Sequence, residues 1–112
     1  MRIQKCTSDG NCVSSLNGVS EKNYFPPLKI LENPIKDIEE ILRKLKIKVV
    51  EKNEYYLRAV AVTKFLRFKD DLEFEYLPNI KEFHFKSASR VGRSDFGVNR
   101  KRLLKIFSLL KI

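Results

Sequence analysis

Polar side chains with hydrogen-bonding chemistry gather in one stretch near the end of the chain, SASRVGRSDFGVNRKR at 87–102. It combines arginines with serines, an aspartate and an asparagine, and it leads into an amphipathic segment. Guanidinium forks suit bidentate pairing with carboxylates or phosphates, and the free N–H groups at a helix start attract anions. The chemistry indicated is that of a buried polar network or an anion-binding site.

Periodicity places several polar residues at positions whose neighbours are apolar. In LRFKDDLEFEY the inward position before Leu72 is Asp70, and in the following strand the inward positions after Phe85 are Ser87 and Ser89. The apolar stripe of the last helix is likewise interrupted by Asn99 and Arg100; its apolar members are Phe96, Leu103, Phe107 and Leu110.

A carboxylate that faces the core costs several kcal/mol unless it is paired. We therefore expect Asp70 to be buried and paired with an arginine of 90–100, with Arg90 and Arg100 as the candidates. Two interpretations stay open: a satisfied network that fixes how the last helix docks, and a pocket that holds an anionic ligand. The candidate ligand-binding residues, which include Ser94 or Asp95 as the helix cap, are Asp70, Ser87, Ser89, Arg90, Ser94, Asp95, Asn99 and Arg100.

The surrounding pattern predicts one α+β domain over 1–112, with an extended, turn-rich arm at 1–27 and a core at 28–112. A single antiparallel sheet with two helices packed on one face follows from the element order β-α-β4-α, because each element has one apolar side to bury. The expected elements are a strand at 28–31, a helix at 34–46, strands at 47–51, 56–62 and 66–76, a strand through Phe83 and Phe85, and a helix at 95–111.

The chain carries a net charge of +9, most of it in 86–112. A basic end attracts nucleic acid, an anionic membrane or a phosphorylated ligand, although a general lysine bias gives the same count. No nucleic-acid motif supports the first of these partners, and the aromatic residues fall on inward-facing positions. The longest apolar runs are too short to span a membrane.

Cys6 and Cys12 form an isolated C-x5-C pattern, and His84 is distant in sequence, so we expect no metal site. Because the chain begins without an apolar signal core, we expect a cytoplasmic protein with two free thiols. No phosphate loop or dinucleotide fingerprint occurs, so no cofactor is expected. Nucleophilic catalysis needs a cysteine or serine beside a base, but His84 is predicted on the solvent-facing side of its strand, where it is expected to be simply exposed.

Three motifs resemble those of domain-of-unknown-function family 1499, a family of small bacterial and plastid proteins. They are NCVSS at 11–15, FLRFKDDLEF at 65–74 and SASRVGRSDFGVNRKR at 87–102. Thr7 and Gly10 stand where the family usually carries prolines. Some relatives are exported or lipid-anchored, so the resemblance makes a Cys6–Cys12 bond and an exported or plastid-type compartment the alternatives. It implies no activity.

These observations favour a small non-enzymatic domain that binds an anionic ligand or a partner protein at the Arg90/Arg100 cluster. The alternatives are a hydrolase-like enzyme that uses Asp70, Asp95 and Arg100 as its acid, base and anion-binding groups, or a basic nucleic-acid-binding module.

Overall fold

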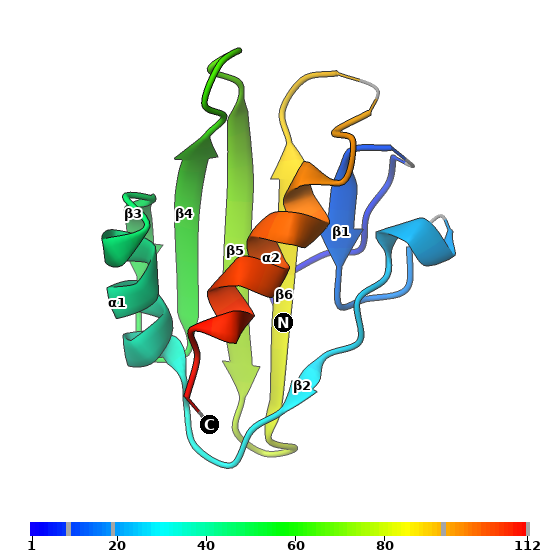
Figure 1. Cartoon of the computed structure of the whole chain (residues 1–112). Helices are drawn as coiled ribbons and strands as arrows, with labels where there is room; N and C mark the ends of the chain where they lie inside the picture. Colours follow the sequence, from blue (N-terminus) through cyan, green and yellow to red (C-terminus); the bar gives the residue numbers. More distant parts are fainter. Residues whose placement is uncertain (9, 19, 93, 112) are drawn as a thin grey trace.

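The computed structural model describes residues 1–8, 10–18, 20–92 and 94–111, and within them the chain forms one antiparallel sheet of six strands (Figure 1). The strand order is β1-β6-β5-β4-β3, and β2 also pairs with β6. The strands are β1 Cys12–Ser14, β2 Leu28–Lys29, β3 Lys48–Lys52, β4 Tyr56–Val62, β5 Lys69–Leu77 and β6 Glu82–Ser89.

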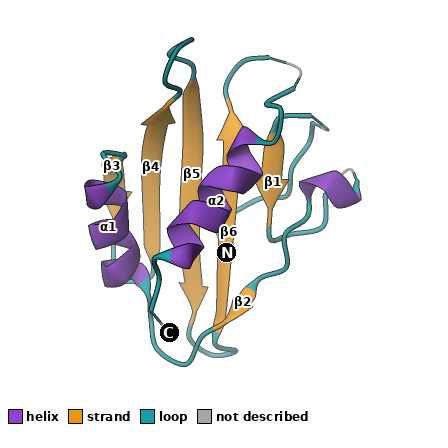
Figure 2. Cartoon of the chain, viewed as in Figure 1, coloured by secondary structure: helices purple, strands orange, loops and turns teal. Residues whose placement is uncertain are grey.

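Two helices, α1 (Ile35–Lys44) and α2 (Val98–Ser108), lie on the same face of the sheet (Figure 2). A short 3-10 helix at Glu21–Asn23 belongs to the segment that joins β1 to β2. The predicted α+β class with a single sheet is therefore confirmed. The order of the elements follows the predicted one, with one additional strand, β1, contributed by the arm.

The core between sheet and helices is aromatic at its centre. Phe85 packs edge-on against Phe25 and Phe107, with ring centroids 5.1 and 4.7 Å apart. Such edge contacts add to the roughly 1.5–3 kcal/mol that burial of a large apolar side chain contributes. From α1 the buried residues are Ile35, Ile38, Ile41 and Leu42.

The strand predicted at 66–76 begins later than expected, at Lys69. Leu66 and Phe68, predicted to face inward, are exposed. Thr63 is the physical reason: its backbone N–H donates to the Phe68 carbonyl at 2.8 Å, and its hydroxyl accepts the Phe68 N–H at 2.8 Å. The hairpin loop is thus closed before the ladder starts, and Arg67 takes a left-handed conformation (φ 58°) within it.

The N-terminal arm is part of the sheet rather than a loose extension. β1 pairs with β6 in the register Cys12↔Ala88, and Cys12 forms a disulfide with Cys6 across a Cα–Cα distance of 5.8 Å. The prediction of two free thiols is wrong, because the turn between the cysteines brings them together. Asn23 holds the same turn by donating its amide to the Cys12 carbonyl at 2.9 Å.

The first residues of the chain cover part of the second face of the sheet, opposite the helices. The backbone N–H groups of Arg2 and Ile3 both donate to Glu75 Oε1, at 2.8 and 3.2 Å. His84, predicted on a solvent-facing surface, is instead buried, and so is Glu75 on the same face of the sheet. The sheet alternation is correct, but alternation alone could not show that this face is partly covered.

Mass spectrometry after alkylation tests the disulfide. We expect no modification of Cys6 or Cys12 in the untreated protein and two modifications after reduction. Replacing both cysteines with serine is expected to lower the free energy of unfolding by about 2 kcal/mol, because a small closed loop removes little chain entropy. Two rapid modifications without reductant would contradict the assignment.

Candidate functional site

Asn99 is the centre of the polar residues at the start of α2. It is fully buried, and its side-chain oxygen accepts the Ser87 hydroxyl at 2.5 Å. Its Nδ2 donates to Asp95 Oδ2 at 2.7 Å, to Ser89 Oγ at 3.0 Å and to the Asn11 carbonyl at 3.2 Å. One amide therefore joins α2 to β6, to the preceding loop and to the arm.

Asp95 lies two residues before Gly97, the N-cap residue of α2, and its side chain accepts hydrogen bonds from the start of the helix. Its carboxylate accepts the N–H of Gly97 at 2.8 Å and that of Asn99 at 3.3 Å. Gly97 has φ 81°, a conformation that favours glycine. Two of the N–H groups that could attract an external anion at this helix start are thus already used by the Asp95 side chain, and the Val98 N–H donates to the Asp95 carbonyl at 3.0 Å.

Asp70 is buried on the helix-facing side of the sheet, as predicted, but its predicted partner is wrong. Its Oδ2 lies 2.8 Å from Nη1 of Arg102; the Asp70 side chain is 1% exposed and that of Arg102 is 13% exposed. Arg102 lies on the inner face because it follows Asn99 by three residues. That spacing was the sequence signal that would have identified it.

The Asp70 carboxylate remains short of hydrogen bonds. Arg102 approaches Oδ2 as a charge, but neither oxygen of Asp70 receives a well-directed hydrogen bond from any described residue. Arg102 Nη1 donates to Asn99 Oδ1 at 3.2 Å. A buried carboxylate without directed donors is uncommon, because the desolvated oxygen loses water and gains nothing in return.

Asp70 and Arg102 lie at one wall of an open cleft of about 440 Å³. The cleft runs between the β4–β5 loop and the β6–α2 loop, which lie at the same end of the sheet (Figure 1). Its surface is mostly apolar. The apolar lining residues are Val62, Phe65, Leu66, Phe68, Val91, Phe96 and Val98.

Arg90 and Arg100 do not join Asp70. Arg90 follows the inward-facing Ser89 and forms a bidentate pair with Asp71 on the second face, at 2.9 and 2.8 Å. This hydrogen-bonded pair lowers the pKa of Asp71 from its ordinary value. Arg100 donates to the carbonyls of Lys22 and Tyr24, both at 2.9 Å, and so anchors the arm.

The structure thus brings together five of the predicted residues and separates three. Ser94 lies at the rim of the cleft, where its hydroxyl accepts the Phe96 N–H at 3.2 Å. Arg93, in the same stretch, lies outside the described residues. The residues that meet are Asp70, Ser87, Ser89, Asp95 and Asn99, and Arg102 joins them.

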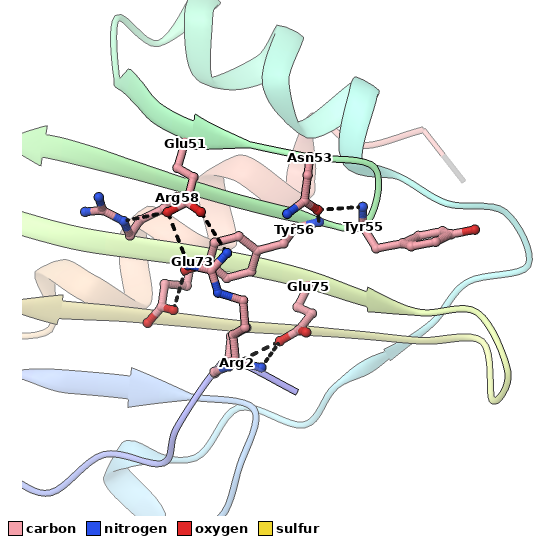
Figure 3. A network of polar contacts seen from close by, with 9 residues as sticks. Arg2, Glu51, Asn53, Tyr55, Tyr56, Arg58, Glu73 and Glu75 are labelled. Carbon is pink, nitrogen blue, oxygen red and sulfur yellow. Dashed lines mark hydrogen bonds and ion pairs between the residues drawn. The ribbon is translucent and has the colours of Figure 1, made fainter.

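A second polar network lies on the opposite face of the sheet, where Arg2 approaches β3 and β4 (Figure 3). Its guanidinium pairs with Glu51 at 2.7 Å and lies 3.8 Å from the centre of the Tyr56 ring. The Tyr56 hydroxyl donates to Glu73 at 2.6 Å. Burial, followed by this hydrogen bond, raises the pKa of Tyr56 far above its ordinary value.

His84 forms a serine–histidine–glutamate chain that the sequence did not suggest. The Ser15 hydroxyl lies 2.8 Å from Nδ1, and Nε2 lies 3.0 Å from Glu82. Ser15 also accepts the Phe85 N–H at 2.9 Å, so its own hydrogen is free to point to His84. Ser15 and His84 are only 3% and 6% exposed. This series of hydrogen bonds therefore holds the end of β1 against β6 and does not present a nucleophile to solvent.

The comparisons with known proteins agree with the family motifs. The chain matches the model of the family described as "Protein of unknown function (DUF1499)" over residues 2–110, and it belongs to that family. No curated protein and no solved structure matches it. No described helix has the length and apolar character needed to cross a membrane, and the described residues form no cluster of metal-ligating side chains.

The neighbouring aspartates Asp70 and Asp71 give a matched pair of variants. Asp70→Ala leaves Arg102 buried without its partner and is expected to lower the free energy of unfolding by about 3–5 kcal/mol. Asp71→Ala breaks an exposed pair with Arg90 and is expected to cost a small fraction of that. Chemical denaturation measures both, and equal losses would contradict the assignment of faces.

Alkaline titration tests the second network. Because the pKa of Tyr56 is raised in the fold, the stability it contributes is complete below about pH 10, the unfolded tyrosine value. It is lost as the pH rises from there through the folded pKa. We expect Tyr56→Phe to flatten this alkaline loss of stability and to remove the last tyrosinate absorbance step. An unchanged profile would show that Tyr56 is solvated.

Proposed function

We propose that this protein is a binding domain whose cleft receives a small molecule with an apolar body and a hydrogen-bond donor. The observation that supports this is the buried carboxylate of Asp70, which lines an apolar cleft and lacks a directed donor among the described residues. A ligand hydroxyl or N–H would supply that donor by displacing the side chains that now separate the buried Asp70 oxygens from the cleft, while the apolar body would be covered by the loop side chains.

The size and chemistry of the cleft support this class of ligand. A volume of about 440 Å³ lies within the range of small-molecule sites, which are mostly apolar with a few convergent polar groups. Here the convergent groups are Asp70, Ser89 and Arg102. Because Arg102 already balances the charge of Asp70, the remaining need is for a hydrogen-bond donor.

An anionic ligand at an Arg90/Arg100 cluster, the function expected from the sequence, is not supported by the geometry. Arg90 is paired with Asp71, and Arg100 is committed to the arm. At the start of α2 the N–H groups of Gly97 and Asn99 already donate to the Asp95 carboxylate. An anion in the cleft would lie near the buried carboxylate of Asp70, so an acceptor end is disfavoured there.

Enzymatic hydrolysis also lacks support from the arrangement. Asp95 is a helix cap and Asp70 is an ion-pair partner, so each carboxylate already has a structural contact. The Ser15–His84 pair is buried away from solvent. The proposed function is therefore binding without turnover.

Three probes share one apolar body and differ only in the polar group at its end, so they test which polar group the cleft prefers. They are 4-phenylbutanol, 4-phenylbutylamine and 4-phenylbutyrate. We expect the alcohol and the amine to bind roughly tenfold or more tightly than the acid, because a hydrogen bond to a charged acceptor is worth about 1.5–3 kcal/mol. Amide chemical shifts measure binding, with changes expected at Leu66, Gly92 and Phe96 and none at Leu31.

The ranking of the three probes is the control against non-specific binding. A folded Asp70→Asn variant is expected to lose the preference for the amine over the acid, because the variant no longer has a charged acceptor in the cleft wall. Asp71→Asn is expected to retain this preference. Tightest binding by 4-phenylbutyrate would refute the donor assignment and favour an anionic ligand at Arg102. Shifts spread over the whole protein would refute the cleft.

A further inference from the structure

The same end of the sheet carries an unusual set of protruding apolar side chains. Phe65 and Leu66, at the tip of the β4–β5 loop, are 89% and 71% exposed, and Phe96, in the β6–α2 loop, is 86% exposed. Val62 and Val91 beside them are 44% and 52% exposed. Contiguous exposed apolar surface of this kind usually marks an interaction site.

Positive charge flanks the apolar side chains of the β4–β5 loop. The segment 62–69, VTKFLRFK, contains Lys64, Arg67 and Lys69 and no acidic residue, and all three cations are exposed. The two loops lie together at one end of the molecule (Figure 1). Leu31 and Ile80, which are also exposed, belong to loops at the opposite end, where charges of both signs are close by in sequence: Lys29, Glu32, Lys81 and Glu82.

We propose that the β4–β5 and β6–α2 loops dock onto an anionic lipid surface, with Phe65 and Phe96 inserted among the lipid chains. Charge complementarity selects a negative surface, because the cations flank the apolar tips. Aromatic and aliphatic side chains that protrude separately from two loops match a deformable apolar phase, which needs no preformed pocket for each of them.

This inference does not rest on the ligand proposed above, although both use the same end of the molecule. The apolar stripe of α2 contributes little to it, because Leu103 and Ile106 are buried against the sheet. The membrane surface would thus be contacted by loops and not by the amphipathic C-terminal helix.

Vesicle co-sedimentation tests the proposal with the full chain. We expect binding to vesicles of equimolar phosphatidylcholine and phosphatidylglycerol, and little binding to pure phosphatidylcholine or at high salt. Phe65→Ser with Phe96→Ser is expected to weaken binding roughly tenfold or more, since each loses the burial of a large apolar side chain. Leu31→Ser with Ile80→Ser is the matched control and is expected to bind as the unaltered protein does.

A charge variant separates this proposal from the ligand site. Arg67 and Lys69 do not line the cleft, so Arg67→Glu with Lys69→Glu is expected to lose vesicle binding and to keep 4-phenylbutanol binding. Absence of vesicle binding, or vesicle binding unchanged by the paired serine substitutions, would overturn the membrane proposal and leave the ligand proposal intact. Binding of a single-stranded oligothymidine with loss in the serine variant, or dimerisation abolished by it, would overturn the proposal by identifying another occupant.

Discussion

The buried amide of Asn99 is the interaction on which the arrangement of this end of the molecule depends. It connects α2 to β6 through Ser87 and Ser89, to the loop through Asp95, and to the arm through the Asn11 carbonyl. A buried amide can satisfy its donors and acceptor only in one docking of the helix. The position of α2, and with it one wall of the cleft, follows from that constraint.

The same constraint decides what kind of chemistry the cleft offers. Asp95 turns towards the start of α2 and accepts the N–H groups of Gly97 and Asn99, so fewer donors remain there for an external anion. Arg102 lies one turn further along, where it balances Asp70 in charge but leaves the carboxylate without a directed donor. The arginine-rich motif therefore contributes to a site in which the Asp70 carboxylate lacks a hydrogen-bond donor. Such a site favours a ligand with a donor over an anionic ligand.

The three family motifs meet in this region although they are far apart in the sequence. Asn11 of the first contacts Asn99 of the third, and Asp70 of the second contacts Arg102 of the third. The first motif reaches this position because β1 is paired with β6 and the Cys6–Cys12 bond closes its turn. The three motifs thus form one structural unit, with the cleft at its outer side.

Local periodicity determined the helices, the four-strand meander and the burial of Asp70, because alternation and helical spacing are properties of neighbouring residues. The helical spacing also indicates that Arg102, three residues after Asn99, lies on the same inner face of α2. Only the tertiary structure decided that Arg90 pairs with Asp71, that Arg100 holds the arm, and that His84 is covered. Each depends on which segment lies against which face of the sheet, and that is set by long-range packing of the arm, where the sequence carries no periodic signal.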